Sequence, residues 1–174
     1  MLTRYAETAE LKPLAAILKR SGSDFAWSRA ALLRYQKNVA GKIAVTLADD
    51  GMVRTILAYR VVDQAAGIHC DKYLHIDTCA LDVDHDADQK RAALSLTHFL
   101  RAALIAHKAD SAVFDVHNCD ADYMRQVCEI GFLPEIVCDE CGGGLYVFSA
   151  TPEHTGSVII ERILSGNAEV YAEV

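Results

Sequence analysis

Apolar residues recur along this chain with two different periods, and the periods separate helical from extended segments. In residues 8–20 and 91–108 they return every three or four positions, which is the spacing of one helix face. A shorter segment after Trp27 has the same spacing, and Ser28 is a residue type that caps a helix start. Pro13 falls in the first turns of its segment, where a missing N–H costs least. We predict three helices at these places.

Extended segments lie between these helices. Residues 42–48 and 53–62 are rich in apolar and β-branched residues, and the stretch between them contains an Asp-Gly pair typical of tight hairpin turns. Residues 72–83 largely alternate between apolar and polar side chains, as a half-buried strand does. The sequence therefore predicts an antiparallel hairpin followed by a third strand.

The second half of the chain adds one more helix and three more strands. Residues 111–116 are a short apolar run, residues 120–131 have helical spacing and end at Gly131, and residues 132–140 and 145–150 lie on either side of a glycine-rich turn. This order of elements predicts an α/β fold.

Composition limits the class of protein. The chain has 174 residues, of which 52% are hydrophobic and 24% are charged, as in a single globular domain. No apolar run approaches the roughly 20 residues that a membrane span needs, and the N-terminus is acidic where a signal peptide is apolar. We expect a cytoplasmic protein without a membrane partner, whose six cysteines are thiols.

The net charge of −7 at pH 7 bears on the partners. Nucleic acid requires a basic surface that neutralises phosphates, so we expect no nucleic-acid partner. An acidic surface favours cationic substrates, although acidity also serves solubility alone.

The segment DVDHDADQKRAA, residues 82–93, is the most unusual part of the chain. Alternate carboxylates begin the calcium loop of an EF-hand, but that loop needs Gly at its sixth position and Glu at its twelfth, where this chain has Ala87 and Ala93. We therefore expect no calcium. The simplest interpretation is a solvated acidic turn whose aspartates favour the positive end of a helix.

Cys138 and Cys141 have the spacing of half a zinc site. A second close pair is missing, so Cys119, Cys128 or His117 would have to converge from elsewhere. We interpret the two thiols as exposed on a turn and predict no metal site.

The segment VFDVHNCDADYMRQVCEIGFLPE, residues 113–135, resembles the GNAT superfamily of acyl-coenzyme A N-acyltransferases. In that family a strand that ends near an Asn leads to a short helix and then to a Gly-Phe pair that opens the next strand. Asn118, Gly131 and Phe132 stand at such places, and the resemblance covers roughly residues 2–150.

The resemblance implies a GNAT-like α/β domain over residues 1–150, with a mixed, mostly antiparallel twisted sheet flanked by helices. Residues 151–174 extend beyond the family's usual last strand and contain an apolar face. This extension either completes the core or contacts a partner subunit, so a homodimer is one expectation.

In the family, a loop with the pattern Arg/Gln-x-x-Gly-x-Gly/Ala binds the pyrophosphate of the coenzyme. Its glycines let the backbone approach, and the first amides of the following helix donate hydrogen bonds. Residues 82–93 stand in this place without a glycine. The resemblance implies that acetyl-coenzyme A contacts the strand end and the helix start at Leu81, Val83, Asp88, Gln89, Lys90, Arg91, Ala92 and Ala93.

Two alignments of that loop are possible. One places Asp88, Arg91 and Ala93 at its three defining positions, and the other places Asp86, Gln89 and Arg91 there. In both, aspartates lie near the pyrophosphate, and like charges at roughly 4 to 6 Å repel by about 1 to 4 kcal/mol each. The two basic residues offset part of this repulsion, so the loop is either a rebuilt coenzyme site or a site that has lost its ligand.

The resemblance also suggests catalytic residues. Asp115 stands where the subgroup that acetylates ribosomal-protein N-termini has its base, and His75 and Asp77, on one face of the central strand, are alternative bases. The family's usual acid is a Tyr four residues before the Gly-Phe glycine, and Val127 occupies that position. Tyr123, one helical turn earlier, is the candidate substitute.

Asn118, or Asp120 by strict spacing, stands where relatives bind the pantetheine arm of the coenzyme. The implied function is transfer of an acetyl group from acetyl-coenzyme A to a primary amine, on a small molecule or a protein N-terminus, by direct attack. The alternative is a catalytically silent module of the same fold that binds or regulates a partner, which the missing glycines and Val127 favour.

Overall fold

The computed structural model describes residues 1–21, 27–37, 41–66, 69–82, 86–116, 121–138 and 143–149. Its helices are α1 (Leu11–Arg20), which follows a short 3-10 helix (Thr8–Glu10), α2 (Arg29–Lys37), α3 (Asp86–His107) and α4 (Ala121–Glu129). Its strands are β1 (Leu2–Tyr5), β2 (Gly41–Leu47), β3 (Val53–Ala66), β4 (His69–Leu81), β5 (Ser111–Val116), β6 (Leu133–Cys138) and β7 (Gly143–Ser149).

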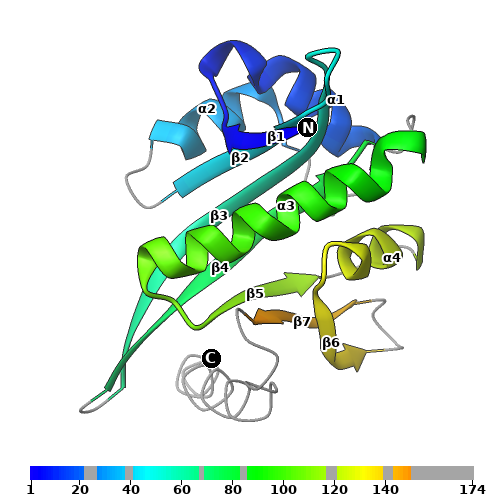
Figure 1. Cartoon of the computed structure of the whole chain (residues 1–174). Helices are drawn as coiled ribbons and strands as arrows, with labels where there is room; N and C mark the ends of the chain where they lie inside the picture. Colours follow the sequence, from blue (N-terminus) through cyan, green and yellow to red (C-terminus); the bar gives the residue numbers. More distant parts are fainter. Residues whose placement is uncertain are drawn as a thin grey trace.

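The sheet is mixed and mostly antiparallel, which confirms the predicted fold class. The strands lie in the order β1-β2-β3-β4-β5-β7-β6. Neighbouring described strands are antiparallel except for β4 and β5, which are parallel. A parallel pair needs a crossover connection, and α3 supplies it (Figure 1).

Each face of the sheet has its own apolar core, and β3 shows the division. Leu57 and Tyr59 belong to the core that includes residues of α3 and α4, whereas Ile56 and Ala58 belong to the core that includes residues of α1 and α2. Because successive side chains of a strand point to opposite faces, the two pairs of helices cover opposite sides of the sheet.

The predicted cap at Ser28, the turn at the Asp-Gly pair and the helix end at Gly131 are confirmed, whereas Thr8, which also had the residue type of a cap, lies inside the short 3-10 helix before α1. The hydroxyl oxygen of Ser28 accepts the amide hydrogen of Ala31 at 3.1 Å, and Pro13 is the third residue of α1. Gly51 lies in the turn between β2 and β3 with a φ of 79°, and Gly131 follows α4 with a φ of 106°. Glycine adopts such angles without the steric cost that other residues meet.

Several elements differ from the sequence prediction. β3 continues to Ala66 instead of residue 62, and β4 begins at His69 instead of residue 72. α3 begins at Asp86 instead of residue 91, because acidic residues are stabilised at the positive end of a helix and the acidic segment therefore enters the helix. β1 has no counterpart among the predicted strands. It is too short to show a period, and it is ordered by antiparallel pairing with β2.

Among the described residues, no helix is long and apolar enough to cross a membrane. The predicted extension over residues 151–174 lies outside the described residues, and so does Cys141 of the cysteine pair.

Candidate functional site

The candidate site lies where β4 and β5 part. Their parallel pairing ends at Ile76 and Phe114, whereas the pairing of β4 with β3 continues to Leu81. One edge of β4 is paired with β3 and the other faces β5. Beyond Ile76, the edge that faces β5 pairs with no strand in the described part of the chain. An edge of this kind can accept an extended ligand through backbone hydrogen bonds.

A β-bulge occurs at the same point of β4. Ala58 pairs with Thr78 and Tyr59 pairs with Ile76, so Asp77 is the extra residue. Bulges redirect side chains and are common next to active sites. The bulge therefore presents the Asp77 carboxylate at the position where the two strands separate.

Asp77 is the centre of a polar network on the α2 side of the sheet. Arg60 of β3 donates from Nε and Nη2 to both carboxylate oxygens at 2.7 to 3.1 Å. The Tyr35 hydroxyl of α2 donates to Oδ2 at 2.7 Å. Nδ1 of His75 lies 3.5 Å from Oδ1 of Asp77 and 3.4 Å from Nη2 of Arg60. The network thus joins β3, β4 and α2.

These contacts fix the charges of the network. Partial burial acts to raise the pKa of Asp77, but hydrogen bonds from His75, Arg60 and Tyr35 outweigh burial and lower that pKa to about 2. The hydrogen bond with Asp77 raises the pKa of Arg60. Burial, together with the bond to Asp77, raises the pKa of Tyr35. At neutral pH the network therefore holds a carboxylate of low basicity, a guanidinium ion and a neutral phenol.

Asp115 lies on the neighbouring strand β5. Phe114, just before it, is buried in the core that includes α3 and α4, and side chains of a strand alternate between faces. Asp115 therefore points to the same side of the sheet as the Asp77 network, and its side chain is exposed.

The helix α4 carries the other predicted catalytic position. Tyr123 belongs to its first turn, and its side chain lies outside the described residues. Val127 is buried in the apolar core, whereas Cys128 is exposed, as their neighbouring positions on a helix predict. No proton donor therefore stands at the position of Val127.

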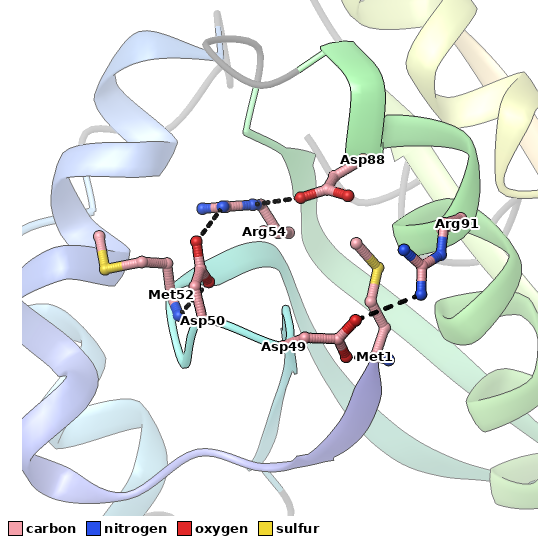
Figure 2. Close-up of polar contacts among 7 residues, drawn as sticks. All are labelled: Met1, Asp49, Asp50, Met52, Arg54, Asp88 and Arg91. Carbon is pink, nitrogen blue, oxygen red and sulfur yellow. Dashed lines mark hydrogen bonds and ion pairs between the residues drawn. The ribbon is translucent and has the colours of Figure 1, made fainter.

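A second polar cluster lies at the start of α3 (Figure 2). The side chain of Arg54, at the start of β3, is only 5% exposed. Its Nη2 donates to Asp50 at 2.8 Å and its Nε to Asp88 at 3.3 Å, while Nη1 has no partner among the described residues. Arg54 thus ties the turn between β2 and β3 to the first turn of α3.

Among the described residues, three further ion pairs lie around this cluster, two that involve exposed Asp49 and one that involves buried Asp82. Arg91 lies 3.4 Å from the carboxylate of Asp49, and both side chains are largely exposed, so this ion pair contributes little stability. The Met1 amino group also contacts Asp49, at 3.1 Å (Figure 2). Asp82 is buried and pairs with Arg20 of α1 at 3.2 Å. Each aspartate of this region whose side chain is described therefore lies near a cation, namely Asp49, Asp50, Asp82 and Asp88.

The structure separates the predicted coenzyme residues into groups. Leu81, Ala92 and Ala93 have buried side chains. Gln89 is half-buried and Lys90 is exposed, while Asp88 and Arg91 join the cluster of Figure 2. The remaining residues, Val83, Asn118 and Asp120, lie outside the described residues.

Sequence reasoning missed Tyr35, Arg54 and Arg60, and it treated Asp49 and Asp50 only as part of a turn. The two arginines interrupt an otherwise mostly apolar strand, and this is a usable signal because a charge in such a strand is costly unless it is paired. Tyr35 gives no comparable signal. Among the described residues, no group of His, Cys, Asp or Glu side chains is arranged to hold a metal ion.

Removing the aspartates around Arg54 is expected to destabilise the protein more than removing Arg54. In the double variant Asp50→Asn with Asp88→Asn, the guanidinium remains buried without a charged partner, which we expect to cost about 3 kcal/mol of unfolding free energy. In Arg54→Met, the carboxylates are 54% and 30% exposed and regain water, so we expect a loss of about 1 kcal/mol. Urea unfolding of both variants measures this, and a larger loss in Arg54→Met would contradict it.

The stabilising contribution of Asp77 is expected to vanish in acid. Its pKa is about 2 in the folded protein and about 3.9 in an unfolded chain, so its charge stabilises the fold above pH 4 and ceases to do so as the pH falls toward 2. We expect Asp77→Asn to lose about 1 to 2 kcal/mol at pH 7, after allowing for solvent screening, and much less near pH 2.5.

The matched control for that measurement is Asp63→Asn. Asp63 pairs with Lys72 at 3.1 Å, but its side chain is 61% exposed, so the change should have little effect at either pH. A constant difference between Asp77→Asn and the unaltered protein from pH 7 to pH 2.5 would show that the lost charge is not the cause.

Comparisons with known proteins bear on the fold of the chain. No protein-family model matches the chain, and no curated protein is significantly similar to it in sequence. Solved structures do match over most of their length. The ribosomal-protein-S18-alanine N-acetyltransferase from Escherichia coli is 14% identical, with coverage of 88% of this chain and 97% of that chain and a TM-score of 0.56.

Two other matches are, according to their names, enzymes that act on small amines. The aminoglycoside 6'-N-acetyltransferase from Enterococcus faecium is 7% identical, covers 89% of this chain and 100% of its own, and has a TM-score of 0.61. A variant of the spermidine N-acetyltransferase from Vibrio cholerae is 11% identical, with 85% and 92% covered and a TM-score of 0.58. At such low identities the likeness concerns the fold, and this chain has the fold of the GNAT N-acetyltransferases.

Proposed function

We propose that this protein transfers an acetyl group from acetyl-coenzyme A to a primary amine. The observation that carries the proposal is the open backbone edge of β4 beyond Ile76, next to the bulge at Asp77, in a sheet of the GNAT kind. The pantetheine arm of the coenzyme is an extended chain with amide groups. It can pair with that edge as an added strand would, with its thioester near the point where the strands part.

The reaction is a direct attack. The amine nitrogen forms a bond to the thioester carbonyl carbon, the carbon–sulfur bond breaks, and the sulfur leaves as a thiolate. The ammonium form of the substrate must first lose a proton to a base, and the thiolate takes up a proton from an acid or from water. The chain therefore has to supply a base within reach of the amine, and a protein nucleophile is not needed.

We assign the role of base to Asp115. It is exposed, and it lies on β5 on the side of the sheet that carries the Asp77 network. Asp77 itself is less suited, because its pKa is about 2 and its oxygens accept hydrogen bonds from Arg60 and Tyr35. His75, 30% exposed beside this network, is the alternative base.

Tyr123 is the proposed acid. It lies in the first turn of α4, one helical turn before the buried Val127, on the helix that follows β5. Its phenol would return a proton to the leaving thiolate, a role that the apolar side chain of Val127 cannot fill.

The start of α3 is the proposed place of the coenzyme phosphates. Because α3 begins at Asp86, the amides without a partner inside the helix belong to residues 86–89, and the helix dipole favours an anion there. Arg54 offsets the charge of Asp88 at this place. Lys90 is exposed and Arg91 is only weakly held, so both can move toward a phosphate.

The second candidate function is a catalytically silent module that binds a partner. The buried Val127 and the acidic, glycine-free start of α3 favour it. Such a module would need neither acetyl-coenzyme A nor a base at Asp115, so one set of experiments separates the two functions.

Calorimetric titration with acetyl-coenzyme A tests the proposal. We expect saturable binding that Lys90→Ala with Arg91→Ala weakens several-fold, by an amount that shrinks at about 0.5 M salt because exposed charges are then screened. Arg101→Ala is the matched control, since Arg101 is exposed on the same helix but far from its start. With the coenzyme bound, Asp115→Asn should lower turnover of an amine about 100-fold without changing coenzyme affinity.

Absence of binding at millimolar coenzyme would contradict the proposal and leave the silent module. Binding with unchanged turnover in Asp115→Asn would remove Asp115 from the mechanism and direct the same test to His75.

A further inference from the structure

The guanidinium of Arg60 has two edges that can each bind a carboxylate, and Asp77 uses one of them. Nε and Nη2 form the side edge, which donates to both oxygens of Asp77. Nη1 and the second hydrogen of Nη2 form the end edge. The Arg60 side chain is 44% exposed, and no hydrogen bond joins Nη1 to the described residues. Nη1 is therefore open to a ligand, while Nη2 also lies 3.4 Å from Nδ1 of His75 at the side of this edge.

The guanidinium of this network is more exposed to solvent than the carboxylate. The Asp77 side chain is only 17% exposed, whereas those of Arg60 and His75 are 44% and 30% exposed. Arg60 and His75 are direct cross-strand partners in β3 and β4. An anion approaching from the α2 side thus meets a guanidinium edge flanked by an imidazole.

The network also fixes the orientation of that edge. Arg60 is held by three hydrogen bonds to Asp77, and Asp77 is held in turn by Tyr35 of α2. A planar guanidinium in a fixed orientation matches the two oxygens of a carboxylate. Because the arginine is already ordered, little side-chain entropy remains to be lost when a ligand binds.

We propose that the end edge of Arg60, next to His75, binds a carboxylate of the acceptor, so that the acceptor is an amine that carries a carboxylate. This inference rests on the proposed acetyl transfer. Asp115 lies on the next strand, β5, on the same side of the sheet. The acceptor then spans the two strands with its ammonium toward Asp115 and its carboxylate toward Arg60. The acidic surface of the protein attracts cations in general, and a polyamine acceptor would leave this edge of Arg60 unused.

The test compares acceptors that differ only in the carboxylate. The panel pairs L-phenylalanine with phenethylamine, and γ-aminobutyrate and β-alanine with propylamine and ethylamine, so that the separation of the two charged groups also varies. Acetylation is measured as release of free coenzyme A from acetyl-coenzyme A. We expect at least one carboxylate-bearing amine to have a kcat/KM at least tenfold above that of its partner.

Variants of Arg60 test whether this residue causes the preference for carboxylate-bearing amines. Arg60→Gln combined with Asp77→Asn removes both charges together, so the carboxylate of Asp77 is not left unpaired. We expect this variant to raise KM for the carboxylate-bearing amine, with a smaller change in kcat, and to abolish the preference. Arg60→Lys keeps the charge but not the fork and should keep part of the preference. Tyr35→Phe removes one bond to Asp77 and should keep most of it.

The outcomes separate this inference from the proposed function. Equal kcat/KM values within every pair, or a preference that survives in the Arg60→Gln, Asp77→Asn variant, would overturn the carboxylate site. So would acetylation of polyamines alone. Failure of acetyl-coenzyme A to bind would instead overturn the proposed acetyl transfer.

Discussion

The parallel pairing between β4 and β5 stops at Ile76 and Phe114, and the candidate site depends on this stop. If the pairing continued, the β4 edge would be saturated by β5 and could not bind a ligand. The bulge at Asp77 lies at the same point and places an acidic side chain there. A largely buried carboxylate is costly unless it is paired, and Arg60 and Tyr35 supply its partners. The network thus makes the bulge compatible with a stable sheet.

Ion pairs with the buried Arg54 also compensate negative charge at the start of α3. An acidic helix start complements the helix dipole, but it also repels an anionic ligand. Arg54 is buried between the β2–β3 turn and the first turn of α3 and pairs with Asp50 and Asp88. Internal ion pairs thus reduce the negative charge at the proposed place of the coenzyme phosphates. The proposed coenzyme site combines the first amides of α3 with Lys90 and Arg91, at a helix start that has no glycine.

Periodicity in the sequence predicted the fold but not the clusters. The helix over residues 91–108, the hairpin at residues 42–62 and the cap at Ser28 follow from local spacing and local turn chemistry. The bond from Tyr35 to Asp77 joins residues 42 positions apart, and that from Arg54 to Asp88 joins residues 34 apart. Such contacts are created by packing of α2 and α3 on the sheet, so local spacing carries no record of them. For the same reason the sequence could name Asp77 and Asp88 as candidates but could not show that arginines hold them.

The central claim is that acetyl-coenzyme A lies along the open edge of β4 and at the first turn of α3. Amide hydrogen exchange with and without acetyl-coenzyme A tests this most directly, because it reports on each backbone segment separately. The account predicts slower exchange in residues 77–81 and 86–89 when the coenzyme is bound, with little change in β1 and β2. Protection confined to other segments, or unchanged exchange at saturating coenzyme, would contradict it.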